Sequence, residues 1–177
     1  MKNPDAGGPV SNAKNIAALP PVEAAALREA MGSFLTGVTI VTARNEAGEP
    51  YGLTVNSFNS VSLDPPLVLW SLDLRNDKLD LFRNAGGFTV NIMQAEQDDL
   101  IWLFAKADTE RFAQTQWHWG VSNQPVLDNT LVSLECRAWA EYDGGDHIIF
   151  VGEVLNINAA KGTPAAFFDG RLGAYQP

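Results

Sequence analysis

The chain has 177 residues, of which 46% are hydrophobic and 19% are charged. A chain of this length fits one compact domain and can bury enough apolar surface for a stable core. Its 12 Lys and Arg residues are outnumbered by 21 Asp and Glu residues, which gives a formal net charge of -9. This balance argues against binding to nucleic acid or to an anionic membrane, so a phosphate-bearing ligand would need a local group of donors.

The N-terminal segment differs in composition from the rest of the chain. Residues 1–21 are rich in Gly, Asn, Ala and Pro, so we expect a flexible arm followed by a single domain over residues 22–177. The arm has no apolar stretch that could act as a signal sequence, and no later stretch approaches the ~20 apolar residues of a membrane span. We therefore expect a cytoplasmic protein that does not associate with membranes.

Soft metal ligands and nucleophiles are scarce. Cys136 is the only cysteine and there are two histidines, so an intrachain disulfide is impossible and we expect no metal site. Cys136 could pair with His118 or His147 as a nucleophile, but it lies in an apolar strand pattern, where a buried thiol is usually inert. The dinucleotide-binding motif G-x-G-x-x-G, the phosphate loop G-x-x-x-x-G-K-[ST] and the nucleophile motif G-x-S-x-G are absent. The common sequence signals for nucleotide binding and ester hydrolysis are therefore missing.

The first expected element is a helix over residues 22–35. Its run VEAAALREAMGSFL is rich in helix formers, and four apolar residues recur at helical spacing on one face: Leu27, Met31, Phe34 and Leu35. The Thr-Gly pair at 36–37 should end the helix.

Expected strands dominate the rest of the chain. β-Branched and apolar residues predict them over residues 38–43, 53–58, 67–70, 88–93, 131–142 and 147–157. The run 67–70 is continuously apolar, which is typical of a strand covered on both faces. Helices are expected within residues 71–84 and over residues 97–105. Because the strands come in hairpins rather than alternating with helices, we predict a mainly β fold with helices, an antiparallel barrel that is closed or split.

Four segments could carry chemistry, and each also has a plainer interpretation. Residues 54–60 are rich in hydroxyl and amide side chains that could hold a cofactor or could line an exposed sheet edge. Residues 71–78 place cations ahead of a short helix and could bind phosphate or form a solvated connector. Residues 144–147 form an expected hairpin tip, where His147 could hydrogen-bond a ligand or remain in solvent. Residues 117–119, Trp-His-Trp, could wall a planar ligand, although packing is the simpler role.

In their order along the chain, these segments resemble the flavin reductase-like family of FMN-binding split barrels, the reductase components of two-component flavin-dependent monooxygenases. The resemblance rests on short motifs in a specific order: FLTGV at 34–38, GLTVNSF at 52–58, SVSLDPPLV at 60–68, FTVN at 88–91, GDH at 145–147 and VGEV at 151–154. It implies an antiparallel FMN-binding split β-barrel in a homodimer that passes hydride from NADH or NADPH to FMN or FAD. The reduced flavin would go to a partner monooxygenase.

The resemblance also implies which residues form the site. The cofactor-binding residues would be Thr54, Val55, Asn56, Ser57, Ser71, Leu72, Asn76, Lys78 and Tyr175. The first four would contact the flavin ring and ribityl chain, and Asn76 and Lys78 its phosphate, although family members often carry Ser or Thr at positions 76 and 77. His147 is the implied catalytic residue, on the nicotinamide side. Hydride transfer between two rings requires close positioning rather than a protein nucleophile, which agrees with the absence of a catalytic triad.

Two other functions fit the same pattern. One is a flavin-binding module that stores or senses FMN without reductase turnover. The other is a flavoenzyme similar to the pyridoxamine-phosphate oxidases, which would call for more Arg and Lys around a substrate phosphate than this acidic chain carries. The sequence leaves open NADH against NADPH, FMN against FAD, and tightly bound against diffusible flavin.

Overall fold

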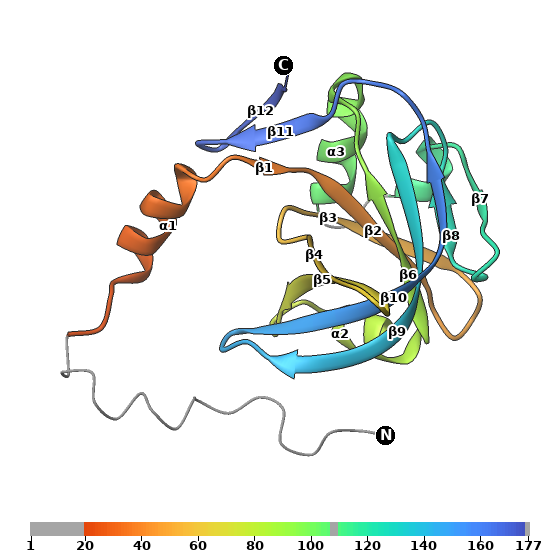
Figure 1. Ribbon diagram of the computed structural model, residues 1–177, viewed down its shortest axis with the longest axis horizontal. Helices are drawn as coiled ribbons and strands as arrows, with labels where there is room; N and C mark the ends of the chain where they lie inside the picture. Colours follow the sequence, from red (N-terminus) through yellow and green to blue (C-terminus); the bar gives the residue numbers. More distant parts are fainter. Residues whose placement is uncertain (1–19, 107–109, 176–177) are drawn as a thin grey trace.

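The computed structural model of the protein describes residues 20–106 and 110–175 (Figure 1). The arm predicted over residues 1–21 lies outside this part except for Pro20 and Pro21, which are exposed and belong to no helix or strand. None of the helices in these ranges combines the length and the hydrophobicity needed to cross a bilayer.

A seven-stranded sheet forms the body of the molecule, with strand order β3-β2-β6-β9-β10-β5-β4. Its strands are β2 (Thr39–Arg44), β3 (Pro50–Val55), β4 (Asn59–Leu63), β5 (Pro66–Asp73), β6 (Gly87–Ile92), β9 (Val132–Asp143) and β10 (His147–Ala159). All pairings between these strands are antiparallel. The mainly antiparallel β fold predicted from the hairpin pattern is therefore confirmed.

The long strands β9 and β10 form the hairpin expected around residues 143–146. Gly145 has φ 78°, a left-handed conformation that favours glycine, and Gly144 N donates to the carbonyl oxygen of His147 at 2.9 Å. Leu74 N donates to the carbonyl oxygen of Asp146 at 3.0 Å. The hairpin tip, and His147 with it, is thereby fixed against the end of β5.

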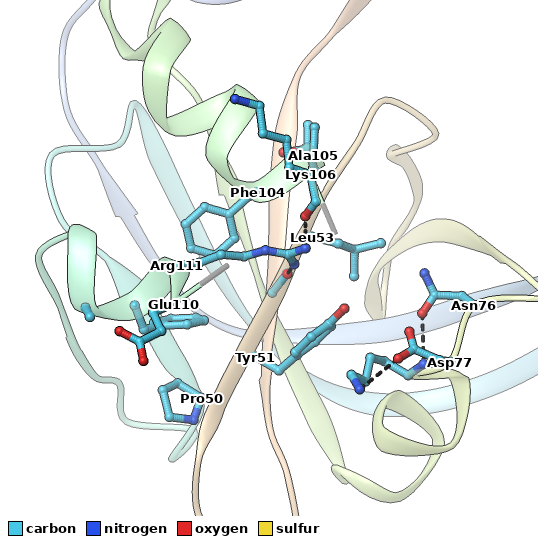
Figure 2. Close-up of a pocket in the computed structure, with 15 residues that line it drawn as sticks. Pro50, Tyr51, Leu53, Asn76, Asp77, Phe104, Ala105, Lys106, Glu110 and Arg111 are labelled. Atoms are coloured by element: carbon cyan, nitrogen blue, oxygen red, sulfur yellow. Dashed lines mark hydrogen bonds and ion pairs between the residues drawn. The ribbon is translucent and has the colours of Figure 1, made fainter. Parts of the chain in front are cut away.

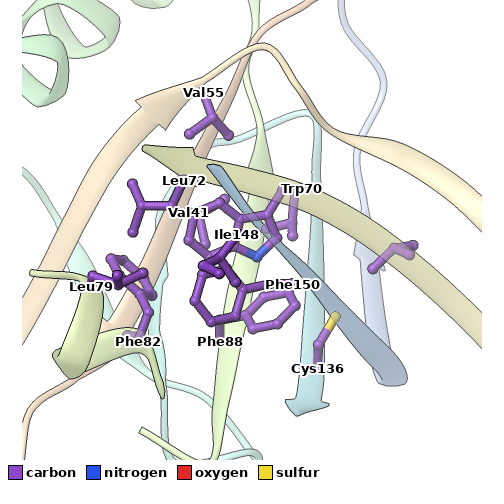
Figure 3. Close-up of a cluster of buried hydrophobic side chains, with 13 residues drawn as sticks. Val41, Val55, Trp70, Leu72, Leu79, Phe82, Phe88, Cys136, Ile148 and Phe150 are labelled. Atoms are coloured by element: carbon purple, nitrogen blue, oxygen red, sulfur yellow. The ribbon is translucent and has the colours of Figure 1, made fainter. Parts of the chain in front are cut away.

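The sheet curls around the main hydrophobic core. Figure 3 shows Val41 from β2 and Val55 from β3 gathered in this core with Trp70 and Leu72 from β5. Trp70 is fully buried and stacks on Phe150 of β10, with ring centroids 4.9 Å apart. Because β3 is one edge of the sheet and β5 lies next to the other edge, only a strongly curved sheet can bring them to the same core.

A pair of hydrogen bonds links the two ends of the curled sheet. Ser57 Oγ accepts a hydrogen bond from Ser71 N at 3.0 Å and donates to the carbonyl oxygen of Ser71 at 3.2 Å. The strand predicted over residues 53–58 therefore ends earlier, at Val55, because the chain turns away from β2 at this point and approaches β5.

Two small sheets and the helices surround the large sheet. The small sheets contain β1 (Thr36–Gly37), β11 (Ala165–Phe168) and β12 (Arg171–Ala174) in one, and β7 (Trp117–Trp119) and β8 (Pro125–Leu127) in the other. The helices are α1 (Ala24–Gly32), α2 (Leu79–Asn84) and α3 (Asp98–Ala105), with the 3-10 turns η2 (Ala95–Gln97) and η3 (Arg111–Gln114). Helix α3, predicted over residues 97–105, buries Ile101 and Phe104 in a second core with Ile40 of β2. This packing holds α3 against the large sheet.

The helix predicted over residues 22–35 is shorter in the structure. It ends at Gly32, so Phe34 and Leu35 lie beyond it. No residue of α1 is buried in the described part of the chain, and Met31 and Phe34 are 54% and 64% exposed. Figure 1 shows α1 projecting away from the body. The predicted helix is therefore confirmed in a shorter form, and its apolar residues are not buried by any described part of the chain.

Strand β5 also differs from its prediction. The apolar run 67–70 was expected to be covered on both faces, but β5 extends from Pro66 to Asp73 and alternates in burial. Val68, Trp70 and Leu72 face the core, whereas Leu67 and Leu69 are only partly buried. This alternation is typical of an antiparallel strand with one face on the core.

Glu135 is a buried carboxylate on β9, with 4% of its surface exposed. It accepts hydrogen bonds from Ser122 N at 2.7 Å, Ser122 Oγ at 2.8 Å and Asn156 Nδ2 at 2.9 Å. Burial alone would raise the pKa of Glu135, but these hydrogen bonds outweigh burial and hold the pKa below its usual value of 4.5. The carboxylate therefore fastens the loop before β8 to β9 and β10.

We expect Glu135→Gln to lower the free energy of unfolding at neutral pH by about 1.5–3 kcal/mol, because hydrogen bonds to a charged group are lost. A carboxyl group whose pKa is depressed by folding stabilises the protein above its unfolded-state pKa, and this contribution disappears as the pH falls through the folded-state pKa. The difference in unfolding free energy between the two proteins should therefore shrink once the pH falls below 4.5, the usual pKa of a glutamate. Urea unfolding at neutral pH and at about pH 3 measures both quantities, and an equal difference at the two pH values would contradict this role.

Candidate functional site

A pocket of about 1000 Å³ opens between β3, the turn before α2, the end of α3 and η3 (Figure 2). Aromatic, polar and charged residues line it together: Tyr51, Thr54, Asn76, Asp77, Lys78, Phe104, Arg111 and Phe112. Its volume lies at the upper end of the range for pockets that hold small ligands. Thr54, Asn76 and Lys78, which the resemblance implies as flavin-binding residues, are thus brought to one pocket although they come from separate segments.

Tyr51 lies in this pocket with two cations close to its ring. Lys78 Nζ is 5.8 Å from the ring centroid and Arg111 Cζ is 5.5 Å from it. Figure 2 shows Tyr51 lying between Arg111 and Asp77, and Asp77 is the ion-pair partner of Lys78. Because the face of an aromatic ring attracts positive charge, Tyr51 helps to place two cations at one pocket of an acidic chain.

Arg111 also lines this pocket, although no motif in the sequence pointed to it. Only 9% of its surface is exposed, and its guanidinium donates hydrogen bonds to the carbonyl oxygens of Gly52 and Lys106. These bonds tie η3 to β3 and to the end of α3. No sequence signal marked Arg111, because its acceptors are main-chain atoms that only the tertiary structure brings near. Figure 2 shows the Lys106 side chain pointing away from Tyr51, so its ammonium does not join the two cations.

The turn that precedes α2 is organised by Asn76. Its Oδ1 accepts a hydrogen bond from Lys78 N at 2.9 Å, and its carbonyl oxygen accepts one from Leu79 N at 3.1 Å. Asp77 Oδ2 lies 2.8 Å from Lys78 Nζ. This contact lowers the pKa of the Asp77 carboxyl, and the charge of Arg111 adds to the effect. Asp77 is therefore ionised at neutral pH.

The hydroxyl groups of the segment 54–57 are already engaged within the protein. Thr54 Oγ1 donates to the carbonyl oxygen of Ile101 at 2.7 Å, and Ser57 Oγ bonds to both main-chain groups of Ser71. Thr54 can therefore offer a ligand only an acceptor. The structure thus gives the hydroxyl-rich segment a role in joining elements that the sequence analysis did not foresee.

The other residues implied for the cofactor do not line this pocket: Val55, Asn56, Ser57, Ser71, Leu72 and Tyr175. Val55 and Leu72 are buried in the main core, so only their main-chain atoms can reach a ligand. Asn56 and Ser57 line a second hollow of about 750 Å³, whose wall includes Met31 and Phe34. The segment 54–57 therefore runs from one hollow to the other.

His147 lies at the start of β10, opposite Asp73 of β5. Its Nδ1 is 2.7 Å from Asp146 Oδ1, so Nε2 is the nitrogen that can reach a ligand. Hydrogen bonds from Arg75 hold the pKa of the neighbouring Asp73 far below its usual value. Among the described residues, the two hollows include neither His147 nor Tyr175, which is 53% exposed after β12. One chain does not bring these two residues to the pocket.

The remaining candidates have structural roles. Cys136 is buried, and burial raises the pKa of its thiol to about 12, so the thiolate needed for nucleophilic chemistry is not formed near neutral pH. Trp117 packs against Phe112 and Trp119, with ring centroids 5.3 Å and 5.0 Å apart. In residues 20–106 and 110–175, His, Cys, Asp and Glu side chains form no group of three or more that could hold a metal ion.

The residues of the pocket at Tyr51 fit a phosphorylated flavin. Lys78 and Arg111 suit a phosphate group, because cations bound to fixed positions are its usual partners in proteins. Tyr51, Phe104 and Phe112 supply the apolar surface that a small planar ligand needs. This combination of a curled antiparallel sheet and a pocket with aromatic and cationic walls suits the class of proteins that bind a phosphate-bearing aromatic ligand.

Known proteins agree with this class. The family described as "Flavin reductase like domain" matches residues 31–176. The FMN reductase (NADH) SmoA of Agrobacterium fabrum is 43% identical over 148 residues, which cover 84% of this chain and 84% of that protein. The reductase component of the flavin-dependent trigonelline monooxygenase of Acinetobacter baylyi is 39% identical over 144 residues, which cover 81% of this chain but only 46% of that protein.

A solved structure gives the same result. The NADH:FAD oxidoreductase SgcE6 of Streptomyces globisporus, in complex with NAD and FAD fragments, is similar with a TM-score of 0.83 and 33% sequence identity. The similarity covers 92% of this chain and 98% of that one. This chain belongs to the flavin reductase-like domain family.

Proposed function

We propose that this chain is an NADH-dependent flavin reductase that passes hydride to FMN or FAD and supplies the reduced flavin to a partner monooxygenase. The observation that carries the proposal is the pocket at Tyr51, where Thr54, Asn76 and Lys78 meet Arg111. The relatives support it, because they include an NADH-dependent FMN reductase and a monooxygenase reductase component. NADH is proposed as the donor because the relatives that name a nicotinamide name this one.

Each group of residues has a defined task in this proposal. Lys78 and Arg111 supply positive charge for the phosphate end of the flavin, and Asn76 holds the turn that carries Lys78. His147, with Nδ1 held by Asp146, offers Nε2 to the nicotinamide nucleotide. A bound flavin supplies the two-electron acceptor, and the protein contributes close positioning of two rings and exclusion of water.

The proposed assembly is a homodimer of split barrels, with the flavin near the subunit interface. Helix α1 supports it, because its apolar side chains Leu27 and Met31 and the following Phe34 are more than half exposed in one chain. A second copy would bury them, since large exposed apolar patches usually mark an interaction surface. The separation of His147 and Tyr175 from the pocket at Tyr51 also favours a site completed by another subunit. Light scattering coupled to gel filtration measures the mass of the assembly.

The proposed domain extends over residues 22–177, with residues 1–21 as an arm. Limited proteolysis followed by mass spectrometry tests this boundary, because cleavage is expected to concentrate before residue 22. The proposed location is the cytoplasm, where NADH is available as the electron donor.

The proposed activity is tested by anaerobic addition of NADH to the purified protein with FMN or FAD. Both the flavin absorbance and the nicotinamide absorbance should fall together. Tight retention of flavin without turnover would instead identify a flavin-binding module. If neither NADH nor NADPH is oxidised with either flavin, the proposal is refuted.

A further inference from the structure

The carboxylate of Asp77 lies in the pocket at Tyr51 together with the cations of Lys78 and Arg111. Asp77 lines this pocket, and its Oδ2 is 2.8 Å from Lys78 Nζ. The Asp77 side chain is 77% exposed, and Figure 2 shows it on the opposite side of Tyr51 from Arg111. The site that suits a phosphate therefore also contains a fixed negative charge.

This charge opposes any phosphate that binds at Lys78. A phosphate oxygen must share the ammonium with the Asp77 carboxylate or displace it, and the two anions then lie close together. Two unit charges about 4 Å apart in water repel enough to weaken binding about fivefold, and a phosphate monoester carries nearly two charges. A neutral flavin without phosphate would not feel this repulsion.

We infer that Asp77 holds the affinity for phosphorylated flavin low, so that flavin exchanges as a substrate rather than remaining as a prosthetic group. This inference rests on the proposed function, in which reduced flavin must leave the pocket to reach a second protein. Lys78 and Arg111 attract the phosphate, and Asp77 limits how tightly it is held. Asp77 is thus a residue that tunes affinity and takes no part in the hydride transfer.

The test compares Asp77→Asn with the unaltered protein in equilibrium binding of FMN and of riboflavin, measured by the change in flavin fluorescence. Asparagine keeps the size of the side chain and removes its charge, and Asp77 is exposed, so the core is not disturbed. FMN should bind about 5- to 10-fold more tightly to the variant, while riboflavin changes less than about twofold. The gain should shrink as salt is raised, because exposed charges are screened.

Asp80→Asn is the matched control. Asp80 lies in the first turn of α2, is 88% exposed and has Arg83 as its partner at 3.7 Å, and it does not line the pocket. It makes the same change in net charge three residues away, so FMN affinity should stay within about twofold. In the double variant Asp77→Asn, Lys78→Met, the tighter binding should be lost.

Three results would overturn the inference: unchanged FMN affinity in Asp77→Asn, an equal gain for riboflavin, or an equal gain in Asp80→Asn. These results are separate from the fate of the proposed function. If the protein oxidises NADH with FMN but Asp77→Asn leaves FMN affinity unchanged, the function stands and the role of Asp77 is refuted. If the protein shows no turnover but binds FMN more tightly after the substitution, the effect of Asp77 on FMN affinity stands and the proposed function is refuted.

Discussion

Replacing His147 with alanine is expected to lower kcat/KM for NADH by about 5- to 150-fold, equivalent to ~1–3 kcal/mol, if its hydrogen bond is made in the complex. The reason is that His147 is held in one orientation by Asp146 and offers Nε2 beside the end of β5. FMN affinity should change little, because His147 does not line the pocket at Tyr51. Steady-state kinetics with varied NADH at saturating FMN, together with FMN titration, measures both quantities.

His118 provides an internal control for this experiment. Its Nδ1 is also 2.7 Å from an aspartate, Asp128, and its side chain is likewise exposed. His118 lies on β7, which Figure 1 shows on the opposite side of the molecule from the tip of the β9–β10 hairpin. His118→Ala should therefore leave kcat/KM for NADH within about twofold of its original value. Equal losses in the two variants, or equal losses for NADH and FMN in His147→Ala, would refute the role given to His147.

Lys78→Glu is expected to weaken FMN binding by about 10- to 100-fold, because it replaces attraction for the phosphate with repulsion. Riboflavin has no phosphate, so its affinity should fall much less. The substitution adds a second carboxylate beside Asp77, and Arg111 remains as the other cation near Tyr51. Titration of both flavins into the variant, followed by fluorescence, gives the ratio of the two affinities.

Lys161→Glu is the control for this charge reversal. Lys161 is exposed between β10 and β11 and does not line the pocket. It changes the net charge by the same amount, so any fall in FMN affinity that it shares with Lys78→Glu reports the overall field of the protein. If FMN and riboflavin lose affinity alike in Lys78→Glu, then Lys78 is not the phosphate contact.

Local patterns in the sequence were sufficient to predict six of the seven strands of the large sheet, but not β4 or the short strands of the two small sheets. The hairpin of β9 and β10 was expected from Asp-Gly-Gly-Asp between two β-branched runs, and α3 from the spacing of its apolar residues. These predictions are confirmed because turn chemistry and side-chain periodicity act over a few neighbouring residues. The helix over residues 22–35 was predicted too long, because apolar spacing does not mark where a helix ends. It ends at Gly32, and Ser33 N and Phe34 N then donate to the carbonyl oxygens of Ala30 and Met31 in a tighter turn.

The sequence indicated some residues of the candidate site, and only the structure revealed the others. The order of short motifs indicated Thr54, Asn76 and Lys78, and the fold brings these three residues to one pocket. The sequence carried no signal for Arg111, because its guanidinium is held by main-chain oxygens of distant segments. The sequence also did not indicate that the hydroxyl groups of Thr54 and Ser57 join α3 and β5 to the end of β3.

The sequence by itself determined the strand-rich composition, the hairpins and the family, because these depend on residue type and order along the chain. Only the tertiary structure decided where the charges meet. The curl of the sheet brings β3, the turn before α2 and η3 to one place, so Lys78 and Arg111 approach Tyr51 from separate parts of the chain. The position of Asp77 also depends on the fold. Asp77 precedes Lys78 in the sequence, but its charge can oppose a ligand only because the fold places it at the pocket.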